Sequence, residues 1–155
     1  MGVWGVWEFG QLVFNYQLPK LSKLFKMSNH SLFQIALVVR DYDEAIDFYV
    51  NKLGFELVED TVMSETKRWV VVSPGVNSCR LLLAKAADEH QLSRVGDQTG
   101  GRVFLFLHTD DIKSFELRLR KENIRILRGP VTEPFGEVIV FEDLYGNKWD
   151  LIQPA

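Results

Sequence analysis

The feature that most restricts the fold of this chain is an internal repeat. Residues 34–41 (QIALVVRD) and 104–111 (FLFLHTDD) are both apolar segments with β-branched or aromatic residues, and both end in an acidic residue. An apolar segment of this length is typical of a strand that is buried on both faces. The repeat therefore predicts two similar modules.

A helical pattern follows each of these segments. In the first copy, Asp41 is the expected N-cap, Glu44 stands at the capping-box spacing, and Gly54 supplies the left-handed residue that ends the helix. In the second copy, Asp111 is the expected N-cap, and Asn123 takes the place of the glycine. The two copies thus predict the same order, a buried strand followed by a capped helix.

Three further strands are expected after each helix, because short β-branched or aromatic segments alternate with turn residues there. We expect these strands at residues 55–60, 67–73 and 79–85 in the first copy, and at residues 124–128, 137–142 and 148–153 in the second. The unit is βαβββ, repeated once. It predicts an α+β fold with one curved sheet per module and the helix on its outer face.

The length of 155 residues suits a single domain. We expect residues 1–31 to be an N-terminal arm or a gene-model extension, because this segment differs in composition from the rest. Residues 32–153 are expected to form the domain, with modules at about 32–85 and 102–153. The polar segment 86–101 between them is the expected linker.

Composition excludes several classes of protein. Lys and Arg total 18 against 21 for Asp and Glu, a net charge of -3, so the basic excess typical of nucleic-acid binding is missing. The single cysteine, Cys79, excludes an internal disulfide and a cysteine-based zinc cluster. No apolar run reaches about 18 residues, so no membrane-spanning helix is expected. We expect a cytoplasmic protein.

The motifs, taken in order, resemble the vicinal oxygen chelate superfamily, which includes glyoxalase I, extradiol dioxygenases, and bleomycin- and fosfomycin-resistance proteins. The similar segments are residues 34–37 with Asp41, residues 48–49 and 53–55 at the start, and residues 143–147 and 149–151 at the end. Each motif is weak by itself, but their order and duplicated spacing are specific. The resemblance covers roughly residues 32–153.

The resemblance implies that the concave faces of the two sheets share a cavity. Enzymes of the family usually hold a divalent metal there with four side chains, two per module. Carried over to this chain, the four positions fall on Gln34, Leu82, Phe104 and Asp150. Leu82 and Phe104 have no electron pair to donate, and a carboxamide with one carboxylate is too small a ligand set. We therefore expect no metal and no other cofactor.

Because residues two apart in a strand share a face, the rest of the lining follows from these positions. The predicted ligand-binding cavity is lined by Gln34, Ala36, Arg80, Leu82, Phe104, Phe106, His108 and Asp150. It combines apolar walls with a few polar groups, which is typical of a small-molecule pocket. Arg80 is expected either to pair with Asp150 or to receive a carboxylate or phosphate of a ligand. No residue is assigned a catalytic role.

The leading hypothesis is a metal-independent small-molecule-binding protein of the glyoxalase/bleomycin-resistance type, with a partly aromatic or amphipathic ligand. A homodimer is expected, because the family commonly pairs modules between chains and free sheet edges need cover. One alternative is an enzyme: a metal-dependent lyase, isomerase or dioxygenase of the same superfamily with displaced ligands. Another is a structural module whose cavity is filled by side chains.

Overall fold

The computed structural model describes residues 30–155. Leu32–Ala155 forms one compact unit. The expectations for the N-terminal arm lie outside the described residues, except at its last two positions. Within residues 30–155, no helix has both the length and the apolar character needed to span a membrane.

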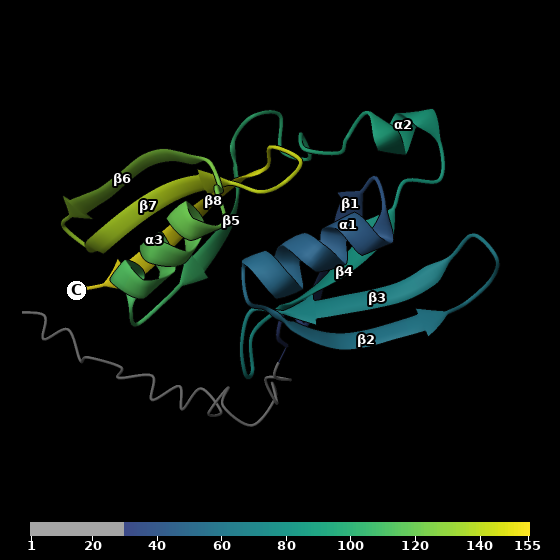
Figure 1. Ribbon diagram of the computed structural model, residues 1–155, viewed down its shortest axis with the longest axis horizontal. Coiled ribbons are helices and arrows are strands. Elements are labelled where there is room, and N and C mark those ends of the chain that lie inside the picture. Colours follow the sequence, from purple (N-terminus) through teal and green to yellow (C-terminus); the bar gives the residue numbers. More distant parts are fainter. Residues whose placement is uncertain (1–29) are drawn as a thin grey trace, which may run out of the picture. The chain divides into compact units, whose positions relative to one another are not determined.

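Each half of the unit follows the same order of elements (Figure 1). The first module contains β1 (Gln34–Val39), α1 (Tyr42–Ile46), which continues as the π-helical η2 (Asp47–Lys52), β2 (Glu56–Val62), β3 (Arg68–Ser73) and β4 (Arg80–Lys85). The second contains β5 (Val103–His108), α3 (Ile112–Lys121), β6 (Ile126–Glu133), β7 (Gly136–Glu142) and β8 (Lys148–Pro154). A short helix, α2 (Glu89–Leu92), lies between them.

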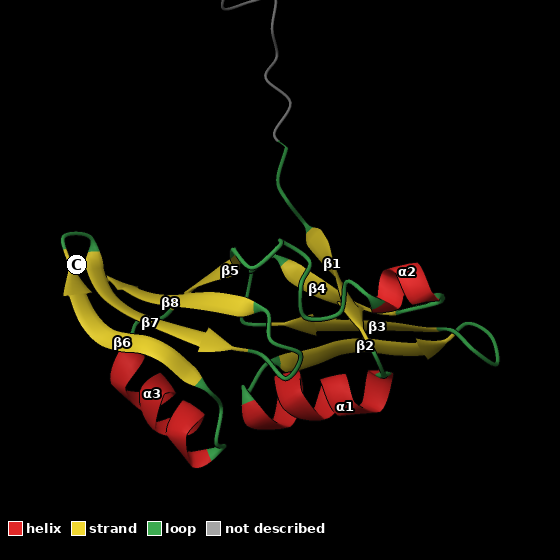
Figure 2. Cartoon of the chain, turned by 90° about the horizontal axis from the view of Figure 1, so that it is seen from above, coloured by secondary structure: helices red, strands yellow, loops and turns green. Residues whose placement is uncertain are grey.

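The strands form two four-stranded mixed sheets, in the orders β1-β4-β3-β2 and β5-β8-β7-β6. In each sheet the first and last strands of the module pair in parallel, and the other pairs are antiparallel. Helices α1 and α3 cover the same side of the strands (Figure 2). The prediction of an α+β fold with two βαβββ modules is confirmed, and the sheets are not closed into a barrel.

The predicted helix ends are present in both modules. The Asp41 carboxylate accepts two backbone N–H bonds in the first turn of α1, and the Asp111 carboxylate accepts one in α3. After the helices, Gly54 and Asn123 adopt left-handed φ angles of 83° and 55°. These four local signals fix where each helix begins and ends.

One hydrophobic core runs through both modules. Its aromatic part joins them directly, because the Tyr49 and Trp149 ring centroids lie 6.1 Å apart. Phe141 stacks on Trp149 at a centroid distance of 5.9 Å, and Phe55 approaches the same indole at 6.2 Å. Burial of these rings supplies hydrophobic stabilisation that neither module would have alone.

The segment between the modules covers part of a sheet edge. The Gln98 side chain accepts a hydrogen bond from the Val38 N–H (2.7 Å) and donates one to the Ala36 carbonyl (3.3 Å). The amide therefore occupies backbone groups on the free side of β1, which an additional strand would otherwise use.

The second strand of module two differs from expectation. We expect it to end at Arg128, before Gly129 and Pro130, yet β6 continues to Glu133 with irregular register on both sides of Arg128. The reason is that β6 is an edge strand, where a proline removes no ladder hydrogen bond on the outer side. As a result, Arg128 lies within the sheet opposite Val140.

Candidate ligand-binding face

Most of the predicted lining residues lie on the faces of the sheets that point away from α1 and α3. In the first sheet, Gln34 is paired with Arg80, and Ala36 is the partner of Leu82. Their neighbours Leu37, Leu81 and Leu83 are buried in the core on the helix side. By strand alternation, the four predicted residues therefore share the opposite face, here called the concave face.

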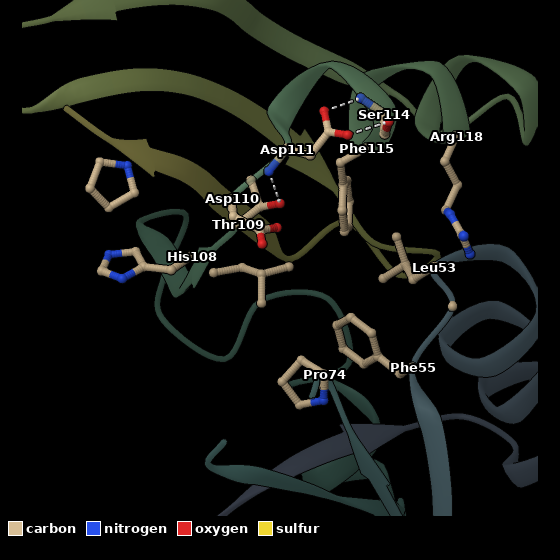
Figure 3. A pocket seen from close by; sticks show the side chains of 13 residues that line it. Leu53, Phe55, Pro74, His108, Thr109, Asp110, Asp111, Ser114, Phe115 and Arg118 are labelled. Atoms are coloured by element: carbon tan, nitrogen blue, oxygen red, sulfur yellow. Dashed lines mark hydrogen bonds between the residues drawn. The ribbon is translucent and has the colours of Figure 1, made fainter. Parts of the chain in front are cut away.

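In the second sheet, Phe106 is paired with Asp150, and His108 follows two residues after Phe106. Trp149 and Leu151, the neighbours of Asp150 in β8, are buried in the core on the helix side. Phe106, His108 and Asp150 therefore share the opposite, concave face. Of the eight predicted residues, His108 also lines a pocket at the junction of the modules (Figure 3).

Phe104 departs from this alternation. The register between β5 and β8 shifts between Val103 and Leu105, which leaves Phe104 without a partner in β8. Its half-buried side chain packs against the hydrophobic core. Phe106, rather than Phe104, therefore stands beside Asp150 in the sheet.

The concave faces are open to solvent in the single chain. None of the eight predicted residues is buried, and Phe106 is 65% exposed. No strand of one sheet pairs with a strand of the other within residues 30–155, so the predicted residues form two groups, one on each sheet. Leu82 and Phe106, which a side-chain-filled cavity would bring together, lie in different groups.

Asp150 is the most unusual polar residue on this face. Its Oδ1 atom is buried and has no hydrogen-bond partner among the described residues. Burial raises the pKa of this carboxyl above its ordinary value, and the charge of Arg128 opposes the rise. A ligand that donates a hydrogen bond to this oxygen would relieve the cost of its burial.

Arg128 is a residue that sequence reasoning missed. Arg128, Val140 and Asp150 form one row across β6, β7 and β8, so their side chains share the concave face. Arg128 also forms an ion pair with Glu133. Strand alternation from Ile126, which packs against the core, would place Arg128 on the core side. The register shift between Ile126 and Arg128 turns Arg128 to the concave face, and no local sequence pattern indicates that shift.

Arg80 pairs with neither Asp150 nor any other carboxylate within the described part of the chain. Its guanidinium lies over the Phe33 ring, 5.0 Å from the centroid. Of the two expectations for Arg80, the ion pair with Asp150 is therefore not formed. The donors of the guanidinium remain available to an anionic group.

A family model for the Glyoxalase/Bleomycin resistance protein/Dioxygenase superfamily matches residues 31–151. The chain belongs to this superfamily. A protein of Shewanella frigidimarina (strain NCIMB 400), described as uncharacterized, is 58% identical over 125 residues, which cover 79% of this chain and 93% of that protein.

Solved structures resemble the fold over most of both chains. TnmS3, described as an antibiotic binding protein from Streptomyces sp. CB03234, is 28% identical with a TM-score of 0.67, covering 83% of this chain and 99% of its own. A glyoxalase/bleomycin resistance protein from the same Streptomyces strain is 29% identical with a TM-score of 0.63, covering 79% and 100%.

The donor set of this superfamily member does not fit a divalent metal. Within residues 30–155, no three His, Cys, Asp or Glu side chains lie close enough together to hold an ion. Gln34 and Asp150 belong to different sheets, and Leu82 and Phe106 beside them carry no lone pair.

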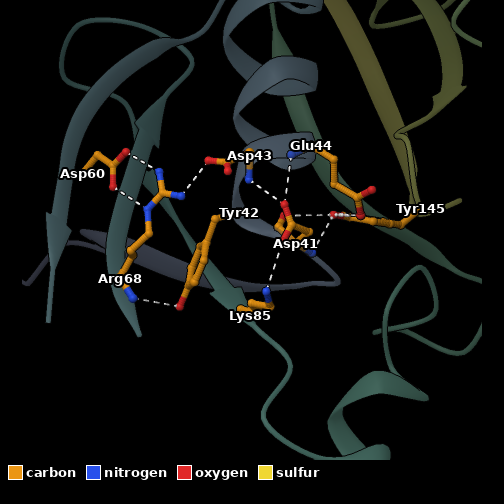
Figure 4. A network of polar contacts seen from close by, with 8 residues as sticks. All are labelled: Asp41, Tyr42, Asp43, Glu44, Asp60, Arg68, Lys85 and Tyr145. Atoms are coloured by element: carbon orange, nitrogen blue, oxygen red, sulfur yellow. Dashed lines mark hydrogen bonds and ion pairs between the residues drawn. The ribbon is translucent and has the colours of Figure 1, made fainter. Parts of the chain in front are cut away.

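A second polar cluster, at the start of α1, supports the fold (Figure 4). Arg68 joins Asp60 of β2 to Asp43 of α1, with Nε–Oδ1 and Nη1–Oδ1 distances of 2.9 and 2.6 Å. Asp41 accepts a hydrogen bond from Lys85 at 3.0 Å. These bonds lower the pKa values of the Asp60 and Asp41 carboxyls. Because the charges are paired with one another, the cluster is best explained as structural.

Proposed function

We propose that this protein binds a small, partly aromatic or amphipathic molecule on its concave faces, without a metal and without changing it chemically. The observation that carries the proposal is the buried, unpartnered Oδ1 of Asp150 beside the exposed ring of Phe106. TnmS3, whose structure is similar to this chain, is described as an antibiotic binding protein, which supports a binding function. We further propose that it acts as a cytoplasmic homodimer.

The chemistry of the face defines the ligand class. Phe106, Leu82 and Val140 supply apolar contact area, which gives affinity without direction. Asp150 accepts a hydrogen bond from a hydroxyl or amine, and Arg128 and Arg80 attract an anionic or strongly accepting group. An amphipathic aromatic compound with both donors and acceptors fits this combination.

The test is a thermal-shift screen of aromatic antibiotics and amphipathic metabolites, followed by calorimetric titration of the hits. A compound that binds the native state raises the midpoint of unfolding. Asp150→Asn should weaken such a hit about tenfold, because a hydrogen bond to a charged acceptor contributes about 1.5 kcal/mol or more. Affinity should also fall as the pH is lowered through the raised pKa of Asp150, since protonation removes the negative charge that strengthens the hydrogen bond to this acceptor.

Asp47→Asn is the matched control, because this aspartate lies in η2 and pairs with Lys52, away from the concave face. It should leave affinity within about twofold of the wild type. Equal losses in both variants would contradict the role of Asp150. One equivalent of Ni, Zn, Fe or Mn in protein purified without chelator would favour the metal-dependent enzyme instead.

A further inference from the structure

A separate pocket lies where the two modules meet (Figure 3). Its volume is about 670 Å³, within the range of about 300–1,000 Å³ that small-molecule sites occupy. Its apolar walls come from both modules and comprise Leu53, Phe55, Pro74, Leu107, Phe115 and Pro154.

Most of this pocket lies on the helix side of the second sheet, away from Asp150, and His108 at the end of β5 also lines it. Leu107, which lines the pocket, packs against the core on the helix side, whereas its neighbour Phe106 faces the concave side with Asp150. The pocket therefore shares His108 with the predicted ligand-binding residues, whereas neither Phe106 nor Asp150 lines it.

Arg118 gives one end of the pocket a positive charge. Its side chain extends from α3 toward the end of η2, where a Cβ built on Gly54 would lie 2.0 Å from Nη1 (Figure 3). The guanidinium can thus lie against the backbone only because residue 54 is a glycine. A cation is favoured at this carboxyl end of a helix, which helps to hold the group in place.

The Arg118 guanidinium is also available to a ligand. Within residues 30–155, no hydrogen bond or ion pair engages its side chain. The nearby Asp111 carboxylate is already engaged, because Oδ1 accepts the Ser114 N–H (3.0 Å) and Oδ2 accepts the Ser114 hydroxyl (2.6 Å). Asp110 lies toward the other end of the pocket from Arg118 (Figure 3).

We propose that this pocket binds a small carboxylate with an aromatic or branched aliphatic body. The planar guanidinium of Arg118 receives the carboxylate through two parallel hydrogen bonds. The apolar body lies between Phe55 of the first module and Phe115, which stands one turn before Arg118 on the same face of α3. The ligand class follows from the Arg118 end of the pocket, where the guanidinium adjoins the apolar walls of Leu53, Phe55 and Phe115.

The test is a titration of the full-length, ¹⁵N-labelled protein with phenylacetate and with neutral phenylacetamide, followed by amide chemical shifts. Phenylacetate should shift the signals of Gly54, Phe115 and Arg118, and should bind at least about fivefold more tightly than the amide. Arg118→Gln should abolish that preference. Arg120→Gln, on the same helix but paired with Glu116, should preserve it.

Equal affinity of the wild type for the acid and the amide would overturn the proposal. An unchanged preference in Arg118→Gln would do so as well. Asp150→Asn separates the two sites, because it should leave phenylacetate binding unchanged. Shifts confined to residues around Asp150 would instead place the carboxylate on the concave face and contradict a separate pocket.

Discussion

Asp143 is a buried carboxylate that links the two modules. It is 6% exposed and accepts hydrogen bonds from the backbone N–H groups of Tyr145 and Asn147, from the Asn147 side chain, and from the Tyr49 hydroxyl. The Tyr49 bond is 2.6 Å long and comes from η2 of the first module. Burial and the Asp143 charge raise the pKa of Tyr49, so its hydroxyl remains a donor.

Tyr49→Phe should lower the free energy of unfolding by about 1–3 kcal/mol, because it leaves a buried charge with one donor fewer while the ring stays in the core. Urea denaturation followed by tryptophan fluorescence measures the change. Tyr42→Phe is the control: its hydroxyl accepts the part-buried Arg68 N–H, at 3.2 Å. Its loss should stay below about 1 kcal/mol. Equal losses would show that the Tyr49–Asp143 bond contributes no more to the free energy of unfolding than the Tyr42–Arg68 bond.

Among the elements, the end of η2 depends most on one residue. Gly54 has a φ of 83°, and its missing side chain leaves the space that Arg118 occupies. Gly54→Ala should therefore cost more than the roughly 1–2 kcal/mol of a left-handed L-residue, because Arg118 must also move. Thermal denaturation measures this loss.

Gly75→Ala is the matched control for that change. Its added Cβ would meet only the Ser78 Oγ at 3.6 Å, an ordinary contact, and its φ is not left-handed. Its effect should stay within about 0.5 kcal/mol. A comparable loss in both variants would mean that neither the left-handed backbone nor the Arg118 contact distinguishes Gly54.

The sequence predicts those parts of the fold that depend on local signals. The N-caps Asp41 and Asp111 and the left-handed residues Gly54 and Asn123 act within one helical turn, so their roles can be identified without tertiary structure. The shift at Phe104 depends instead on how β5 pairs with β8, a contact between distant segments. No local sequence pattern indicates the register with which two distant strands pair.

The same distinction applies to the sites. Alternation from the positions that the resemblance gives places Asp150 and Phe106 on one face, because both lie where the pairing of β5 with β8 is regular. Arg118 lies on an exposed basic stretch of α3, and nothing near it in the sequence indicates that it reaches Gly54. Its role requires the packing of one module against the other, which sequence periodicity does not describe.

For the molecule as a whole, the open concave faces leave apolar surface without cover. Phe106 is 65% exposed on one sheet, and Ala36 on the other is exposed beside the half-buried Leu82. Exposed apolar surface with polar residues around it is typical of an interaction site. A second copy of the chain could place the face of one sheet opposite the other, which would enclose a ligand that a single chain leaves open to water.

We therefore expect light scattering of the full-length protein to give twice the 17.9 kDa mass of the chain. Phe106→Glu should shift the mass toward the monomer, because association would bury an unpaired charge. Leu117→Glu is the control, since Leu117 is 69% exposed on α3, on the helix side of the sheet.

If the dimer completes the site, a ligand that binds it must strengthen dimerisation by the same free energy by which dimerisation strengthens ligand binding. A monomeric Phe106→Glu variant that bound a screening hit with wild-type affinity would mean that one chain suffices.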